Sequence, residues 1–122
     1  MDILIFVAAA IVAVWGVAHL FATRGVVAGF GELTTDNRRI ITMEWMVEGV
    51  ALISTAAYAA TVTALDSGAS VSNAVYAVAI VTLAALAIVS VFTGFRVAFL
   101  PFRLCPVIFT LAAVLIAVGA WA

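Results

Sequence analysis

Four apolar runs, each long enough to cross a lipid bilayer, follow one another along the chain. They extend over about residues 3–21, 40–63, 74–98 and 106–121, and about 20 apolar residues in a helix span a hydrocarbon core of about 30 Å. Of the 122 residues, 68% are apolar and 9% are charged, whereas a soluble domain is about half apolar and about a quarter charged. The sequence therefore predicts an all-α membrane protein, a single domain of four transmembrane helices in two hairpins.

The connections between the runs carry the signals for helix ends. Thr23–Arg39 is the longest and most polar connection, and Gly25, Gly29 and Gly31 within it are expected to interrupt a regular helix. We expect Thr35 or Asp36 to cap the helix that follows.

The second half of the chain has its own end signals. Ser72 or Asn73 is expected to cap the third helix. Pro101 is expected to end that helix, and Pro106 to lie in the first turn of the fourth.

The basic residues predict how the helices are oriented. Arg24, Arg38 and Arg39 flank the first connection and Arg96 and Arg103 flank the third, while the termini and the second connection carry no basic residue. Positive side chains are enriched in cytoplasmic loops. We therefore expect a multi-pass protein of the inner (cytoplasmic) membrane with both termini outside. The Ala/Val-rich composition, with Arg but no Lys, is typical of a GC-rich bacterial genome.

Two glutamates enter the second apolar run four residues apart. Residues at this spacing share one helix face, and at about 1.5 Å per residue Glu44 and Glu48 lie roughly 6 and 12 Å inside the run. Ionisable groups at such depth are energetically unfavourable and indicate a functional site. Two adjacent carboxylates repel each other, so one is expected to hold a proton. We expect Glu48, the deeper, to carry it, and Glu44 to be ionised and paired with Arg96 or His19.

These ionisable residues are predicted to converge near the cytoplasmic leaflet. His19 lies near the end of the first helix, Glu44 and Glu48 lie on the second, and Arg96 lies on the third. Cys105, at the start of the fourth, is interpreted as a packing residue. Candidate ligand-binding side chains around this layer are Arg96, Trp15, Trp45, Thr55 and Tyr58.

Four interpretations of this layer stay open. It could hold the helices in register through intramembrane ion pairs, or bind a metal through His19, Glu44 and Glu48. The one histidine of the chain does not provide the paired Glu-x-x-His motifs of di-iron bundles, so no metal or other cofactor is predicted. Catalytic roles for Glu44, Glu48 and His19 in acid–base chemistry on a lipophilic substrate are the third interpretation. A small proton-coupled transporter is the fourth.

The first half of the chain resembles the DoxX-like small four-helix membrane proteins. The resemblance rests on Gly16-x-x-His19-Leu-Phe near the end of helix one, on Arg39 followed by Glu44 and Gly49 in helix two, and on the two-hairpin layout. It implies a left-handed four-helix bundle, linked in that group to quinone or redox partners and to assembly of other membrane proteins. A lysine often stands there at the position of His19.

The favoured function is binding of a small hydrophobic ligand or of a partner membrane protein, in an assembly or accessory role. A membrane-embedded acid–base enzyme is the alternative, and a proton-coupled transporter the second alternative. The expected partners are membrane lipids and further copies of the chain in a homo-oligomer, since small-residue strips such as Ala9, Ala13 and Gly16 suit close helix packing. The net charge of −1 argues against a nucleic-acid partner.

Overall fold

The structure is a computed structural model that describes all residues, 1–122. It contains four α-helices and one short 3-10 helix, and each α-helical segment is long and apolar enough to cross a membrane. The predicted all-helical fold with four apolar helices is confirmed at this level. The elements are α1 (Asp2–Gly29), α2 (Thr35–Asp66), α3 (Ser70–Phe92), η1 (Gly94–Arg96) and α4 (Leu100–Trp121).

The first helical hairpin is longer than the sequence indicated. α1 continues to Gly29 instead of ending near residue 21, so the expected interruption at Gly25 is wrong, whereas the helix does end at Gly29. A single glycine reduces helix stability by only about 1 kcal/mol, and Val27 of this extension is buried in the structure. The chain turns at Gly31, whose φ of 75° suits a residue without a side chain.

The start of α2 is displaced in the same direction. The helix begins at Thr35 and not near residue 40, because Thr34 supplies the cap: its Oγ1 accepts a hydrogen bond from the Asn37 N–H at 3.2 Å. The predicted caps, Thr35 and Asp36, are therefore one and two residues too late.

The second hairpin also differs at its ends. α3 begins at Ser70, before the predicted caps Ser72 and Asn73. It ends at Phe92 and not near residue 98, because the backbone of Thr93 leaves the helical region. Pro101 starts α4 instead of ending α3, as its missing N–H is harmless in a first turn. Pro106 therefore lies inside α4.

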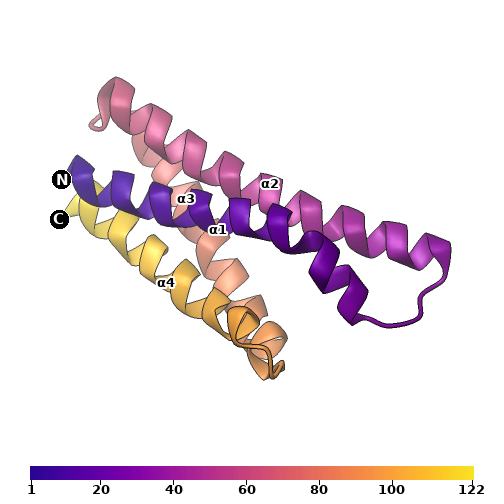
Figure 1. Ribbon diagram of the computed structural model, residues 1–122. Helices are drawn as coiled ribbons and strands as arrows, with labels where there is room; N and C mark the ends of the chain where they lie inside the picture. The colour runs from indigo at the N-terminus through magenta and orange to yellow at the C-terminus, as the bar shows by residue number, and fades with distance from the viewer.

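The two hairpins are packed together at one end and separated at the other (Figure 1). Each helix packs on two neighbours, in the order α1, α2, α3, α4 and back to α1. The termini and the α2–α3 turn lie at the packed end, and the tips of the two hairpins diverge from it. We call these the closed end and the open end.

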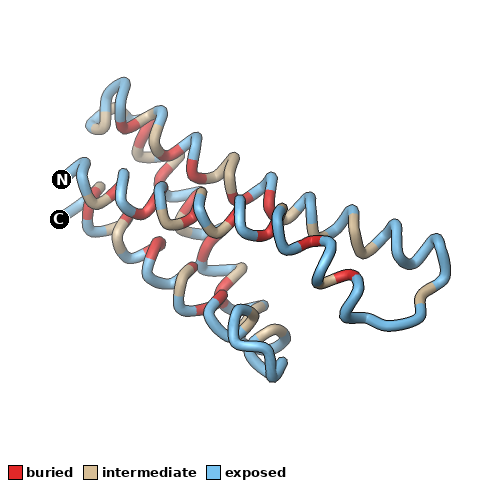
Figure 2. Tube along the Cα trace, viewed as in Figure 1, coloured by how far each residue is buried: buried red, intermediate tan, exposed pale blue.

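Buried residues concentrate toward the closed end (Figure 2). They include small residues that allow close helix approach and a few large side chains that fill the centre. The fully buried large side chains are Tyr76, Phe109, Ile5, Leu52, Leu83, Ile116 and Val12.

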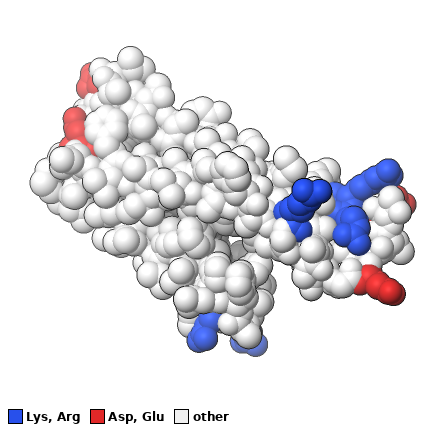
Figure 3. Space-filling view, in the orientation of Figure 1, with Lys and Arg blue, Asp and Glu red and all other residues white.

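The charged residues separate along the same direction. Figure 3 shows the arginines at the two hairpin tips of the open end, whereas acidic residues are the only charged side chains visible at the closed end. At about 1.5 Å per residue, the 28 residues of α1 and 32 of α2 extend over about 42 and 48 Å. A hydrocarbon core is about 30 Å thick, so the tip of the first hairpin is long enough to project beyond it.

Candidate functional site

A close contact between two glycines positions the candidate site. A Cβ added to Gly16 of α1 would lie 2.8 Å from the carbonyl oxygen of Gly49, and one added to Gly49 would lie 2.9 Å from the carbonyl oxygen of Gly16. Only glycine permits this approach of the two backbones. His19 follows Gly16 by one turn and Glu48 precedes Gly49, so this contact brings the two ionisable side chains together.

His19 is the only buried residue among the histidine, arginines and acidic residues of the chain. Its Nε2 lies 3.5 Å from Oε1 of Glu48, and its side chain is only 5% exposed. On the other side of the ring, Nδ1 lies 2.9 Å from the carbonyl oxygen of Trp15. Both ring nitrogens therefore have a partner within the protein.

The hydrogen bond to Trp15 determines how many protons the pair holds. A carbonyl oxygen only accepts, so Nδ1 carries a hydrogen and donates it. The tautomer thus assigned leaves Nε2 without a proton in the neutral ring, facing a carboxyl oxygen. Two lone pairs repel, so a favourable contact between Nε2 and Glu48 requires one further proton between them, on either group. With that proton, the pair of His19 and Glu48 is neutral as a whole and holds one transferable proton.

Trp45 holds the histidine in place from α2. The two rings are stacked with centroids 4.7 Å apart, and Trp45 Nε1 donates a hydrogen bond of 2.8 Å to the His19 carbonyl oxygen. Thr23 Oγ1 donates to the same oxygen at 2.8 Å. Phe102 of α4 packs edge-to-face with Trp45, with centroids 5.4 Å apart. The ring of His19 is thus held by aromatic residues of the first hairpin, and Phe102 of the second hairpin packs on Trp45.

The site lies at the inner end of a cleft between the two hairpins. Three adjoining cavities of about 300, 510 and 760 Å³ share lining residues along it, and we call them together the inter-hairpin cleft. A hollow between the hairpins is visible in Figure 3. Residues shared by two or more of these cavities are His19, Ala22, Val26, Trp45, Val97, Phe99, Phe102 and Cys105.

The walls of the cleft are mostly apolar and aromatic. Trp15, Trp45, Phe99 and Phe102 supply the aromatic rings. His19 lines both the 300 and the 510 Å³ cavities, and the other polar side chains lie only at the 510 Å³ cavity. That cavity is lined on the α2 side by Glu48 and on the α3 side by Ser90 and Thr93. Such a combination of apolar walls and few convergent polar groups is typical of small-molecule sites.

The structure separates some residues that the sequence placed in one layer. Arg96 lies in η1, is exposed and makes no ion pair, so its predicted pairing with a glutamate is wrong. Glu44 is exposed and likewise unpaired. The partner of His19 is Glu48, whereas the sequence assigned an ion pair to Glu44.

Two other predicted binding residues lie apart from the cleft. Thr55 lines a neighbouring cavity of about 450 Å³, which shares Trp45, Glu48 and Leu86 with the 510 Å³ cavity of the cleft. Its hydroxyl donates to the Ala51 carbonyl oxygen at 2.9 Å. Tyr58 is 67% exposed on the outer face of α2. Trp15 and Trp45, in contrast, do lie at the cleft.

A metal site is not assembled by these residues. No three His, Cys, Asp or Glu side chains come together in an arrangement that could hold a metal ion. His19, Glu44 and Glu48 are therefore not a ligand set. Cys105 lines the cleft, but both nitrogens of His19 are already engaged, so His19 does not activate the thiol.

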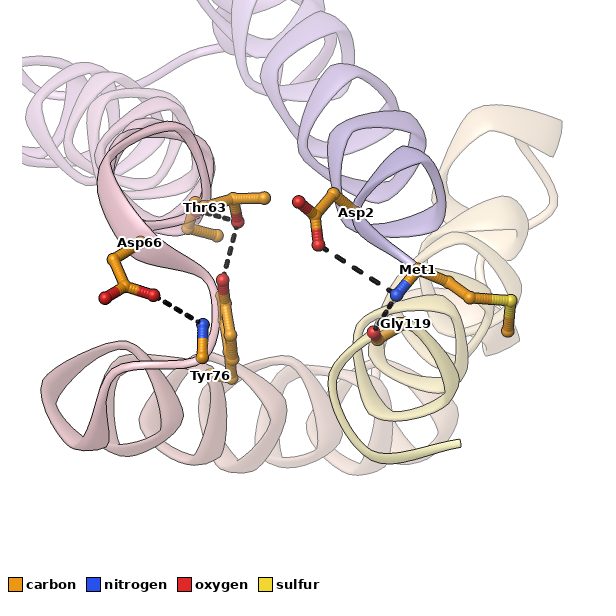
Figure 4. A network of polar contacts seen from close by, with 8 residues as sticks. Met1, Asp2, Thr63, Asp66, Tyr76 and Gly119 are labelled. Carbon is orange, nitrogen blue, oxygen red and sulfur yellow. Dashed lines mark hydrogen bonds and ion pairs between the residues drawn. The ribbon is translucent and has the colours of Figure 1, made fainter.

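Sequence reasoning missed the polar network of the closed end. Tyr76, fully buried, pairs its hydroxyl with Thr63 Oγ1 at 2.8 Å (Figure 4). In the same view the Met1 amine donates to the Gly119 carbonyl oxygen at 3.1 Å. The sequence analysis also did not identify Ser90 and Phe102 as residues that line the cleft. Phe99 and Phe102 are three residues apart at the start of α4, so they lie on one side of the helix. This spacing is the sequence signal that could have indicated the aromatic wall of the cleft.

No family model, no curated protein and no solved structure matches this chain. The resemblance to DoxX-like proteins therefore stays a prediction.

Proposed function

We propose that this chain is a membrane protein that binds a small lipophilic molecule in the inter-hairpin cleft, in an accessory role. The observation that carries the proposal is the position of the His19–Glu48 pair at the inner end of an otherwise apolar, aromatic cleft. A buried ionisable pair is unfavourable in a low-dielectric region. A ligand with an apolar body and one polar group matches both the walls and the pair.

The proposed membrane is the bacterial inner membrane, with both termini outside. The positions of all five arginines at the open end support this orientation. Glu32 and Gly68, at opposite ends and both exposed, provide the test. In a Cys105→Ala background, Gly68→Cys should react with a membrane-impermeant thiol reagent added outside, and Glu32→Cys should not. The reverse labelling would overturn the orientation.

Ligand binding can be followed through the tryptophans of the cleft. Trp15 and Trp45 line it, whereas Trp121 lies at the closed end, so Trp121→Phe leaves only the two reporters. The probe is undecanol carrying a terminal bromine, since bromine quenches indole fluorescence on contact. We expect saturable quenching in nanodiscs, and an organic extract of the purified protein should contain a lipophile by mass spectrometry.

A blocking variant separates binding in the cleft from nonspecific partitioning. Ala22 lines the cleft, so Ala22→Phe should fill part of it and weaken quenching about tenfold, equivalent to about 1.4 kcal/mol. Ala10→Phe makes the same change at an exposed site of α1 outside the cleft and should leave quenching unchanged. Linear, non-saturating quenching that Ala22→Phe does not alter would contradict the proposal.

An acid–base enzyme is the second candidate, because the His19–Glu48 pair holds one transferable proton beside the cleft. The observation that decides between the two is the fate of the bound lipophile. A molecule released unchanged after incubation supports binding, and a chemically altered one supports catalysis. The predicted homo-oligomer is tested separately, by native mass measurement across a range of protein concentrations.

A further inference from the structure

The 510 Å³ cavity of the inter-hairpin cleft has an excess of hydrogen-bond acceptors, and the unpartnered donor Trp15 Nε1 lines only the adjoining 300 Å³ cavity. In the 510 Å³ cavity, His19 offers nothing to a ligand, because Nδ1 donates to Trp15 and Nε2 shares a proton with Glu48. Thr93 has used its only donor on the Val89 carbonyl oxygen, at 2.7 Å, and keeps only acceptor capacity. A ligand therefore meets few donors here.

Glu48 supplies most of the unused acceptor capacity. The carboxyl group of Glu48 has several acceptor positions in either protonation state, yet its only partner is His19, at 3.5 Å. Its side chain is 38% exposed and lines the cavity. An oxygen left without a donor in an apolar setting is unfavourable, so a donor supplied by the ligand would stabilise the site.

Ser90 lines the same cavity from the opposite hairpin. It lies on α3, is half-buried, and its hydroxyl makes no hydrogen bond within the protein. A serine hydroxyl both donates and accepts. The free groups across the cavity are thus an acceptor on α2 and a donor–acceptor on α3.

The charges around the cavity exclude an anionic ligand. Arg96 is exposed without an ion pair, and the guanidinium of Arg103 lies over the ring of Phe95, 5.2 Å from its centroid. Neither arginine lines the inter-hairpin cleft. A carboxylate or phosphate would lie beside Glu48 with no cation to balance it. A fixed cation is not needed either, because the His19–Glu48 pair is neutral as a whole.

We infer that the ligand is a neutral lipophile whose head group is a hydroxyl, donating to Glu48 and accepting from Ser90. This inference rests on the proposed binding function and specifies the chemistry of its ligand. The hydroxyl bridges α2 and α3, and the apolar body follows the aromatic walls toward the open end. Long-chain alcohols and alkylated phenols belong to this class, and fatty acids and phospholipids do not.

Three probes with one chain length distinguish the head groups. They are undecanol with a terminal bromine, its methyl ether, and the corresponding bromine-tipped undecanoate, titrated against Trp121→Phe protein in nanodiscs. The ether accepts but cannot donate. One net hydrogen bond contributes about 1 kcal/mol, so half-quenching by the alcohol should need about fivefold less probe than by the ether. The carboxylate should quench least.

Ser90→Ala tests the hydroxyl partner, and Ser54→Ala is the matched control. Ser54 lies on α2, is also half-buried, and does not line the cleft. Ser90→Ala should raise the alcohol concentration needed for half-quenching about threefold to fivefold and leave that of the ether unchanged, whereas Ser54→Ala should change neither concentration. Equal quenching by alcohol and ether, strongest quenching by the carboxylate, or an alcohol preference that survives Ser90→Ala would overturn the inference while binding itself stands. If no probe quenches saturably, the proposed function fails as well.

Discussion

The two ends of the bundle use their polar groups in opposite ways. At the closed end, polar side chains have partners within the protein: the buried Thr63 Oγ1 pairs with the Tyr76 hydroxyl, and the exposed Trp121 Nε1 donates to Asn73 Oδ1 at 2.9 Å. At the open end, Glu48 has one long contact and Ser90 has none. Satisfied polar groups specify and stabilise a packed core, whereas unsatisfied ones next to a cavity mark a place for a ligand.

Packing differs in the same direction. At the closed end, a Cβ on Gly119 would lie 2.7 Å from Ile5 Cγ1, so α1 and α4 are in direct contact. At the open end, the corresponding faces of these helices line the cleft. The comparison teaches that the closed end provides the stability of the bundle and that the open end can change with little loss of fold.

The sharpest test makes the same change at two positions of α4, one in its first turn and one in its middle. Phe109 is fully buried at the core, whereas Phe102 is half-buried beside the cleft. Phe109→Ala should decrease the free energy of unfolding by about 3–5 kcal/mol, and Phe102→Ala by about 1 kcal/mol, since cleft space already surrounds it. Thermal unfolding of both variants in one detergent measures the difference. Equal losses would show that the open end contributes as much stability as the closed end.

A second pair of variants tests the glycine contact that positions the site. In Gly16→Ala, the new Cβ meets the Gly49 carbonyl oxygen at 2.8 Å, so α1 and α2 must separate, at about 1–3 kcal/mol. Gly25 lies in the same helix with nothing within 4 Å of its added Cβ. Gly25→Ala should therefore stabilise by up to about 1 kcal/mol. Thermal unfolding gives both values, and a neutral Gly16→Ala would contradict the contact.

Much of the fold was predictable because it depends on composition alone. The apolar runs indicate four helices, and the small residues near Gly16 indicate close packing in α1. The boundaries were less accurate, because α1 continues through Gly25 as far as Gly29, and neighbours such as Val27 become buried there. Tertiary packing there outweighs local propensity.

The candidate site was predictable only in part. The spacing of Glu44 and Glu48 correctly places both on one side of α2, where they line one cavity. Which of them meets His19 depends on how α1 and α2 cross, and the Gly16–Gly49 contact that determines this is not readable from one helix. Tyr76 pairs with Thr63 of another helix, and no periodic pattern signals such a pair.

Substitutions in the Thr63–Tyr76 hydroxyl pair of the closed end should destabilise the protein less, and the two single variants should differ in their loss of stability. Thr63→Val leaves the Tyr76 hydroxyl, which is fully buried, without a partner and should destabilise by about 1–3 kcal/mol. Tyr76→Phe should destabilise by only about 1 kcal/mol, because Thr63 Oγ1 keeps its bond to the Ala59 carbonyl oxygen, at 2.7 Å. The double variant should lose less than the sum of the two. Additive losses measured by thermal unfolding would mean that the two hydroxyls do not interact.

The smallest changes in stability are expected for substitutions of Glu44 and Glu48. Their effect on the infrared spectrum is therefore the more sensitive test. Glu48→Gln keeps a donor for His19 Nε2, since the amide N–H₂ replaces the shared proton, and should destabilise by about 1 kcal/mol or less. Glu44→Gln should lie within about 0.5 kcal/mol of the unaltered protein, because Glu44 is exposed and unpaired. This reverses the order expected from sequence, which assigned the ion pair to Glu44.

Infrared spectroscopy locates the proton of the pair. Two opposite charges next to an apolar cavity are less favourable than two neutral groups that share a hydrogen bond, so the proton should reside on the carboxyl of Glu48. The C=O stretch of a protonated carboxyl should then be present in the unaltered protein and in Glu44→Gln, and absent in Glu48→Gln. Persistence of the band in Glu48→Gln would assign the proton to another residue. Absence of the band from the unaltered protein would instead show that His19 is an imidazolium and that His19 and Glu48 form an ion pair at the inner end of the cleft.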